Sequence, residues 1–200
     1  GCAEGDCGAC TISWVEQTPE GPALRSVNSC LVLLPMMHGR VAWTVEGLRR
    51  ADGGYHPAQE ALVRALGSQC GYCTPGVVMT MLEACYRQDL DAPWKLEDQM
   101  AGTLCRCTGY RPIMEATREV AATRPEGPIL DALGAPAALP GLDYRAGQRF
   151  VRPTTMDQLW AVLAEEPAVR FVNGATDLGL EVTKRRRSWP CLVALDGLAG

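Results

Sequence analysis

Helical spacing of apolar residues marks the middle of the chain. After Pro57, apolar side chains recur at three- and four-residue intervals, which places them on one face of a helix: Ala58, Ala61, Leu62, Ala65 and Leu66. Thr74 and Pro75 open a second segment of this kind, a short helix is expected at 96–104, and a fourth starts at Pro112. The pattern predicts four short helices in this region.

Strand-like segments precede the helical region, and a segment without period follows it. We expect strands at 11–15 and 42–45, on either side of an apolar run at 31–37. Residues 124–149 contain four prolines and four glycines and show neither a helical nor a strand period. We therefore expect a linker at 124–149.

The last fifty residues alternate between strand and helix patterns. Short apolar runs at 150–152, 169–172 and 192–195 read as strands, and helical spacing at 156–163 and 178–185 lies between them. Alternation of this kind is typical of α/β proteins. It predicts the beginning of an α/β domain after residue 149.

The composition is that of a globular protein without a strong charge bias. The 200 residues include 19 Lys and Arg against 23 Asp and Glu, a net charge of −4, and 47% are hydrophobic. A dedicated nucleic-acid-binding protein would carry a basic domain, so that class is disfavoured. The longest apolar run is far too short to span a membrane, and no leader-like segment opens the chain. We expect a soluble cytoplasmic protein.

Ten cysteines, with no export signal, suggest metal ligands rather than a disulfide framework. The first four are spaced C-x4-C-x2-C-x19-C, the spacing of plant-type [2Fe–2S] ferredoxins: Cys2, Cys7, Cys10 and Cys30. Glycines at positions 1, 5 and 8 permit the tight turns that bring three thiolates together. Zinc is the weaker alternative here, because zinc motifs usually pair their cysteines as C-x2–4-C.

A second set is spaced C-x2-C-x31-C-x-C and comprises Cys70, Cys73, Cys105 and Cys107. A predicted helix start follows each pair, at Thr74 and at Pro112. The partial positive charge of a helix N-terminus favours an anionic cluster and its added electron. On spacing alone zinc remains a real alternative for this set, because both kinds of site use C-x2-C pairs.

Three motifs resemble the molybdenum hydroxylases: the loop 1–11, the segment GSQCGYCTPG at 67–76 and the segment LCRCTGYRPI at 104–113. Two iron–sulfur domains followed by a flavin-type segment resemble the xanthine dehydrogenase branch, particularly the smaller chain of the two-chain bacterial enzymes. The resemblance implies roughly 40 further residues before Gly1 and a continuation past Gly200. The chain starts without Met and stops after a strand-like run, so we expect both ends to be cut.

The resemblance implies an α+β fold in three parts. Residues 1–48 would be part of a β-grasp, plant-type [2Fe–2S] ferredoxin domain, and 49–123 a four-helix [2Fe–2S] domain. The linker 124–149 would lead to the start of an α/β FAD-binding domain at 150–200. The eight cysteines named above would hold two [2Fe–2S] clusters.

Further site residues follow from the resemblance alone. Gln69, directly before Cys70, occupies the place of a glutamine that hydrogen-bonds molybdopterin. A strand–glycine–helix turn by itself is usually structural. By resemblance this one matches the FAD pyrophosphate loop, where Ala175 replaces the Asn or Gly often seen. That loop comprises Val172, Asn173, Gly174, Ala175, Thr176, Asp177 and Leu178.

The function implied is electron transfer during hydroxylation of hypoxanthine and xanthine to urate, with NAD as acceptor. Molybdopterin and the purine would lie on a large partner chain, in a heterotetramer, and this chain would carry no catalytic residue. Two alternatives stay open: another molybdenum hydroxylase, such as an aldehyde oxidase or aromatic-heterocycle hydroxylase, and a zinc-binding interaction module. Cys85 and Cys191 are expected to be buried structural residues, and His56 a helix cap.

Overall fold

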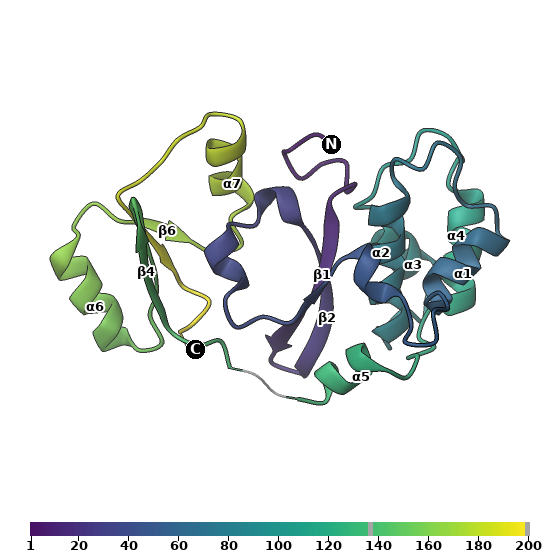
Figure 1. Ribbon diagram of the computed structural model, residues 1–200, viewed down its shortest axis with the longest axis horizontal. Helices are drawn as coiled ribbons and strands as arrows, with labels where there is room; N and C mark the ends of the chain where they lie inside the picture. The colour runs from purple at the N-terminus through teal and green to yellow at the C-terminus, as the bar shows by residue number, and fades with distance from the viewer. Residues whose placement is uncertain (136–137, 199–200) are drawn as a thin grey trace. The chain divides into compact units, whose positions relative to one another are not determined.

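The computed structural model describes residues 1–135 and 138–198, which form two compact units (Figure 1). Unit 1 comprises Gly1–Ser29 and Val41–Pro136, and unit 2 comprises Cys30–Arg40 and Ala137–Gly200. The chain therefore leaves unit 1 after Ser29 and returns to it at Val41.

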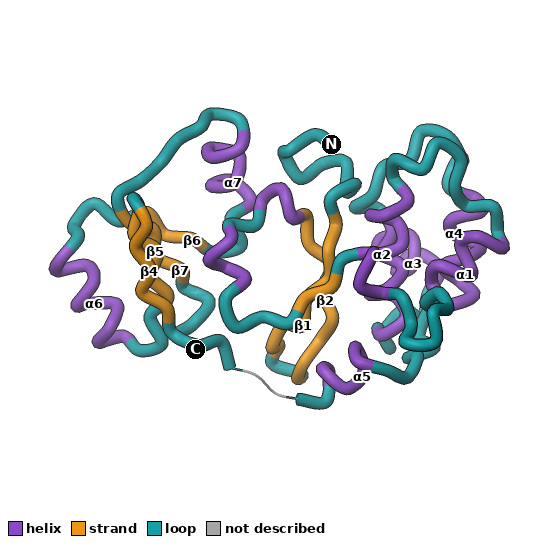
Figure 2. Tube along the Cα trace, in the orientation of Figure 1, coloured by secondary structure: helices purple, strands orange, loops and turns teal. Residues whose placement is uncertain are grey.

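Unit 1 combines a small antiparallel sheet with a group of helices. Its strands β1 (Thr11–Thr18), β2 (Gly21–Asn28) and β3 (Ala42–Trp43) lie in the order β2-β1-β3, and β1 and β2 form a hairpin. Four helices follow, as predicted, although the third spans 93–100 rather than the expected 96–104 (Figure 2). They are α1 (Pro57–Arg64), α2 (Thr74–Tyr86), α3 (Pro93–Met100) and α4 (Arg111–Val120).

Helix α2 is the centre of unit 1. All its residues from Gly76 to Tyr86 are buried, because the sheet packs on one side and the other helices on the rest. The hydroxyl groups of Ser13 and Ser26, on neighbouring strands, donate to the Met79 carbonyl at 3.3 and 3.0 Å. These bonds satisfy polar groups at the sheet–helix interface.

Unit 2 contains a four-stranded sheet in the order β4-β5-β7-β6. The strands β4 (Leu142–Ala146) and β5 (Gln148–Arg152) form an antiparallel hairpin. The strands β5, β7 (Cys191–Ala194) and β6 (Arg170–Val172) are parallel. Helix α6 (Met156–Glu165) connects β5 to β6, and α7 (Thr176–Thr183) connects β6 to β7. This alternation confirms the predicted start of an α/β domain.

The expectation that 124–149 lacks regular structure is wrong. Helix α5 (Pro128–Leu133) begins with proline in its first turn, and its Ile129 is buried in the core of unit 1. The second departure is β4, which the hairpin turn at Gly147 (φ +75°) pairs with β5. Both elements are too short for a recognisable hydrophobic period.

The apolar run 31–37 forms 3₁₀ turns, η1 (Ser29–Leu31) and η2 (Leu34–Met37). Met36 is buried in a cluster with Phe150, Val172 and Leu192. The segment 30–40 is thus part of the core of unit 2. A third turn, η3 (Val45–Leu48), occupies the end of the strand expected at 42–45. Among the described residues, no helix combines the length and apolar character needed to cross a bilayer.

Candidate metal and cofactor sites

The N-terminal loop is shaped around its thiols. The backbone N–H groups of Cys7 and Glu4 each donate to Cys2 Sγ at 3.4 Å, and they lower the pKa of Cys2 to about 7. Between Cys2 and Cys7 the backbone has positive φ angles at Ala3 (+57°) and Gly5 (+82°), which turn it so that these N–H groups face sulfur. A loop with amides directed at thiolates suits an anionic iron–sulfur cluster.

Hydrogen bonds to the end of β2 hold this loop in place. Asn28 Nδ2 donates to the Gly5 carbonyl at 2.6 Å, and Ser29 Oγ donates to the Cys10 carbonyl at 2.8 Å. Cys30 is the next residue along the chain. It is the first residue of the segment 30–40 and is described with unit 2.

The second cysteine set converges from two turns of unit 1. Cys73 contacts Cys105, and Cys70 contacts Cys107, so the four thiols meet in two pairs. A [2Fe–2S] cluster takes two protein ligands on each iron, which this paired arrangement can supply. Within residues 1–135 and 138–198, no group of three or more Cys, His, Asp or Glu converges as ligands for a single ion.

Local hydrogen bonds fix the turn that carries Cys105. Its backbone N–H donates to the Tyr110 hydroxyl at 2.8 Å, and its sulfur lies 3.2 Å from Thr108 Oγ1. Gly109 (φ +65°) and Tyr110 (φ +66°) then reverse the chain into α4. Thr108 and Tyr110 were not predicted as site residues, although both lie in the motif at 104–113.

The protein environment shifts the pKa values of two thiols of this set, Cys73 and Cys105, in opposite directions. Burial raises the pKa of Cys73 to about 11, and the neighbouring Cys105 adds to the effect. Burial also acts to raise the pKa of Cys105, but hydrogen bonds from Thr108, Cys107 and Cys73 together outweigh it and lower the value to about 7. A bound metal holds all its thiol ligands as thiolates, so it would remove this difference.

All four cysteines line a cavity of about 280 Å³ together with Gln69 and Arg106. Cys70, Cys107 and Gln69 are exposed, whereas Cys73 and Cys105 are buried. Gln69 therefore lies where a group outside this chain can reach it. The donor chemistry, four soft sulfur atoms in one small cavity, fits a [2Fe–2S] cluster.

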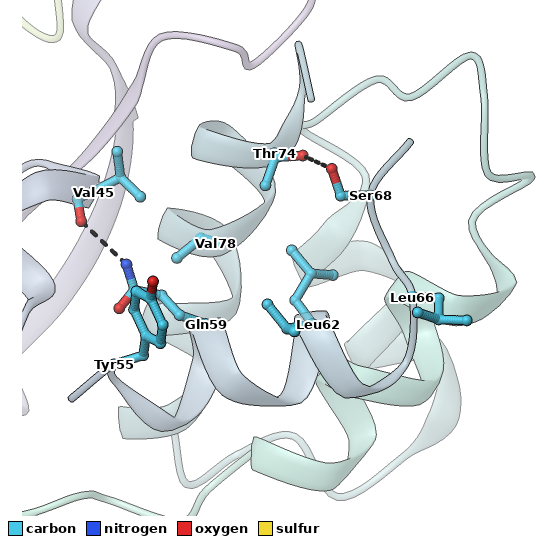
Figure 3. Close-up of a pocket in the computed structure, with 9 residues that line it drawn as sticks. Val45, Tyr55, Gln59, Leu62, Leu66, Ser68, Thr74 and Val78 are labelled. Carbon is cyan, nitrogen blue, oxygen red and sulfur yellow. Dashed lines mark hydrogen bonds between the residues drawn. The ribbon is translucent and has the colours of Figure 1, made fainter. Parts of the chain in front are cut away.

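A larger apolar cavity of about 440 Å³ is lined mainly by residues of α1 and α2 and of the segment between them (Figure 3). Its two polar contacts bind α1 and α2 to neighbouring segments: Gln59 Nε2 donates to the Val45 carbonyl at 3.3 Å, and Ser68 Oγ lies 2.6 Å from Thr74 Oγ1. Its lining residues carry no formal charge: Val45, Tyr55, Gln59, Leu62, Val63, Leu66, Ser68, Thr74 and Val78. The cavity therefore offers shape and apolar surface but no acid or base.

The predicted FAD loop joins β6 to α7 in unit 2. Gly174 (φ +74°) and Ala175 (φ +60°) both adopt left-handed backbone conformations, and a side chain at Gly174 would meet open space. The exposed residues of the loop are Asn173, Gly174, Thr176 and Asp177, and the buried ones are Val172, Ala175 and Leu178. An open turn before a helix N-terminus fits a pyrophosphate. The three buried residues have apolar side chains, so only their backbone groups could hydrogen-bond the pyrophosphate.

Two predictions about ordinary residues are confirmed. Cys85 and Cys191 are fully buried in the cores of their units. His56 caps α1, because its Nδ1 accepts from the Ala58 N–H at 3.2 Å while Gln59 Oε1 accepts from the His56 N–H at 2.9 Å.

Comparison with known proteins identifies the domains in which some of these residues lie. Residues 44–118 match the family model described as a [2Fe-2S] binding domain, and residues 144–200 match an FAD binding domain in molybdopterin dehydrogenase. Xanthine dehydrogenase of Drosophila subobscura is 33% identical over 240 residues, covering 96% of this chain and 18% of the relative. Xanthine dehydrogenase of rice (Oryza sativa) is 48% identical over 122 residues, which cover 59% of this chain and 9% of that protein. The chain is an iron–sulfur and FAD segment of the xanthine dehydrogenase family.

The chain covers less than a fifth of the length of these relatives. Among solved structures, aldehyde oxidoreductase of Desulfovibrio gigas is similar with a TM-score of 0.52 and 29% identity, over 61% of this chain and 13% of that one. The second cysteine set and the loop 172–178 lie inside the two matched models. The first set, Cys2 to Cys30, precedes both.

Proposed function

We propose that this chain is the electron-transfer part of a xanthine dehydrogenase. It would pass electrons from a molybdopterin site on a large partner chain through two [2Fe–2S] clusters to FAD and then NAD, during hydroxylation of hypoxanthine and xanthine to urate. We expect a cytoplasmic heterotetramer. The observation that carries the proposal is the convergence of Cys70, Cys73, Cys105 and Cys107 in one cavity, within the segment that matches a [2Fe–2S] domain.

Each part of the chain has a role in this proposal. Cys2, Cys7, Cys10 and Cys30 hold the first cluster, in a ferredoxin-like domain, and the second set holds the helical cluster. The exposed residues of the loop 172–178 bind the FAD pyrophosphate with backbone N–H groups at the start of α7. Gln69 offers an amide that both donates and accepts, which suits the edge of a pterin.

The clusters and the flavin supply one- and two-electron chemistry, and the protein sets where it occurs and at what potential. Amides directed at Cys2 and the Thr108 hydroxyl beside Cys105 Sγ stabilise negative charge on sulfur. Exposure of Cys70 and Cys107 leaves one side of the helical cluster accessible to an electron donor.

Metal analysis of the complete enzyme tests the cluster assignment. We expect four iron and four labile sulfide for each copy of this chain, with the visible absorption of iron–sulfur proteins. Cys105→Ser should lower the iron content by about half and leave the first cluster intact. Zinc in place of iron, in a colourless protein, would end the proposal in favour of a zinc-binding interaction module.

A second experiment tests the direction of electron flow. If Gln69 meets the pterin, the helical cluster is the one nearer to molybdenum. In the Cys105→Ser enzyme, mixed anaerobically with substrate, molybdenum should still be reduced while flavin bleaching slows or stops. Gln69→Leu should instead lose molybdenum cofactor while both clusters remain. Flavin bleaching at the parent rate in Cys105→Ser, or full molybdenum retention in Gln69→Leu, contradicts the corresponding assignment.

The second candidate function is electron transfer in another molybdenum hydroxylase. The similarity to aldehyde oxidoreductase of Desulfovibrio gigas supports this candidate. The cysteine sites would be the same in either enzyme, because only the molybdenum-bearing chain contacts the substrate. Turnover of xanthine, an aromatic aldehyde and quinoline by the assembled enzyme separates the two. Activity with xanthine supports the first candidate, and activity with only the aldehyde or quinoline supports the second.

A further inference from the structure

The two cysteine loops of unit 1 are in direct backbone contact. The N–H of Leu104 donates to the carbonyl of Cys7 at 3.0 Å. Cys7 is a predicted ligand of the first cluster, and Leu104 immediately precedes Cys105, a predicted ligand of the second. Covalent bonds and this single hydrogen bond therefore connect the two sulfur atoms.

Glycines allow this approach. A Cβ on Gly76, in the first turn of α2, would overlap the Gly8 carbonyl oxygen and lie 3.2 Å from the Cα of Ala9. A Cβ on Gly8 would overlap the Gly102 carbonyl and lie 2.7 Å from the Cα of Thr103. Because each clash is with backbone atoms, a side chain at either position would separate the loops.

Two buried threonines connect α2 to the turn that carries Cys105. Thr80 Oγ1 donates to the Gly76 carbonyl at 3.0 Å and lies 3.0 Å from Thr103 Oγ1. Thr103 is 2% exposed and directly precedes Leu104. This arrangement joins the first turn of α2, the N-terminal loop and the turn of Cys105.

We propose that Gly76 and Thr103 are positioning residues that fix the separation of the two cluster sites by clamping the Cys7 loop against the Leu104 turn. The inference rests on the proposed function and adds the route between its clusters. One electron crossing this contact oxidises one iron of the donor cluster from Fe²⁺ to Fe³⁺ and reduces one iron of the acceptor from Fe³⁺ to Fe²⁺. No bond is made or broken, and no proton moves.

The test compares Gly76→Ala with Gly102→Ala in the complete enzyme. Gly102 lies in the same region, but a Cβ there would meet no atom within 4 Å and its φ is not positive, so it is a matched control. Thr103→Val is the milder second variant, because it preserves side-chain size and removes only the hydroxyl. Iron analysis first establishes that each enzyme carries both clusters.

The measurement is the magnetic interaction between the two clusters after full reduction with dithionite, when both are paramagnetic. Dipolar splitting falls with the cube of their separation. We expect the splitting to be weakened most in Gly76→Ala, less in Thr103→Val, and to be unchanged in Gly102→Ala. Equilibration of a single added electron between the clusters should slow in the same order.

Unchanged splitting and electron equilibration in Gly76→Ala and Thr103→Val, with full iron content, would overturn the inference. The proposed function fails separately. It fails if the parent enzyme itself contains no pair of [2Fe–2S] clusters, a result that the initial iron and sulfide analysis gives before any variant is made.

Discussion

Arg152 donates through Nη2 to the carbonyl oxygen of Met36 at 2.9 Å, although the two residues are 116 positions apart in the sequence. The Arg152 side chain is fully buried, and it also binds the His38 carbonyl at 2.8 Å and Asp196 Oδ1 at 3.0 Å. Arg40 pairs with the other Asp196 oxygen at 2.8 Å. One guanidinium thus attaches the segment 30–40 to the sheet of unit 2.

Replacing this arginine should release the segment. Arg152→Met removes the donor to the His38 carbonyl, one of the two donors to the Met36 carbonyl, and the ion pair with Asp196, while Arg40 Nε remains 3.2 Å from the Met36 carbonyl. We therefore expect unit 2 to lose about 2–4 kcal/mol of stability. Hydrogen exchange at the amides of 31–40 should accelerate strongly. Arg149→Met is the control, because Arg149 lies on the same strand but pairs with Asp143 and Glu165, whose side chains are largely exposed. Equal exchange at 31–40 in both variants contradicts the role given to Arg152.

His56 makes stability depend on pH in a defined window. Burial, with a contribution from Arg50, lowers its pKa to about 4, and its Nδ1 is occupied as the acceptor of the α1 cap. The unfolded chain takes up this proton near pH 6.5. Between pH 6.5 and 4 the unfolded state therefore binds more protons, and the free energy of unfolding falls as the pH falls.

The full effect is about 3 kcal/mol, reached below pH 4 and absent above pH 6.5. His56→Asn keeps a capping oxygen but does not titrate, so its unfolding free energy should change less with pH. Denaturant unfolding of both proteins at pH 7 and pH 5 gives the comparison. Parallel losses in parent and variant on going to pH 5 would show that His56 is not responsible.

Ala175 should tolerate replacement by glycine unusually well. Its positive φ costs an ordinary residue roughly 1 kcal/mol, which glycine avoids. That gain offsets the buried methyl group, worth about 0.8 kcal/mol. Ala175→Gly should thus leave the unfolding free energy nearly unchanged. Ala194→Gly, at a buried position in the same hydrophobic cluster with no positive φ, should cost about 1–2 kcal/mol. A large loss in Ala175→Gly alone contradicts the strain argument.

Cys85 should be dispensable for metal binding. It is fully buried in α2, and burial raises its pKa to about 12, as expected of an inert structural thiol. Cys85→Ala should retain the parent iron content at a stability cost of about 1–2 kcal/mol. In Cys70→Ala the iron content should fall by about half. Iron loss from Cys85→Ala means that the ligand set is wrong.

The sequence predicted helices α1 to α4 of unit 1 because their apolar residues repeat with a clear period. It did not predict β2, where Leu24 is the only fully buried residue between Gly21 and Asn28. That strand is stabilised by tertiary contacts, including the buried Glu83, whose carboxylate accepts from the Ser26 N–H at 2.8 Å. Such a bond joins residues that no local pattern relates.

The candidate sites show the same limit. Cysteine spacing and motif resemblance named the thiols of the helical cavity, because ligand spacing is a local property of the chain. The contact between Cys7 and Leu104 could not be predicted, since it depends on how α2 packs against the N-terminal loop. The sequence also could not predict that Cys30 belongs to unit 2, because this depends on the hydrogen bonds of Arg152 and on the packing of Met36.

The placement of 30–40 also has a consequence for biosynthesis. Its carbonyl groups find their donor on Arg152 only after more than a hundred further residues have been made. At about 5–20 residues per second, the ribosome needs roughly 6–20 seconds for that stretch. During this interval the sheet of unit 2 does not yet exist, so the apolar side chains of this segment stay exposed: Leu31, Leu33 and Met36. We therefore expect a chaperone to bind the nascent chain at this segment. Under the proposed function Cys30 is a ligand of the first cluster, so we expect that cluster to be completed only after residues 138–198 have been made.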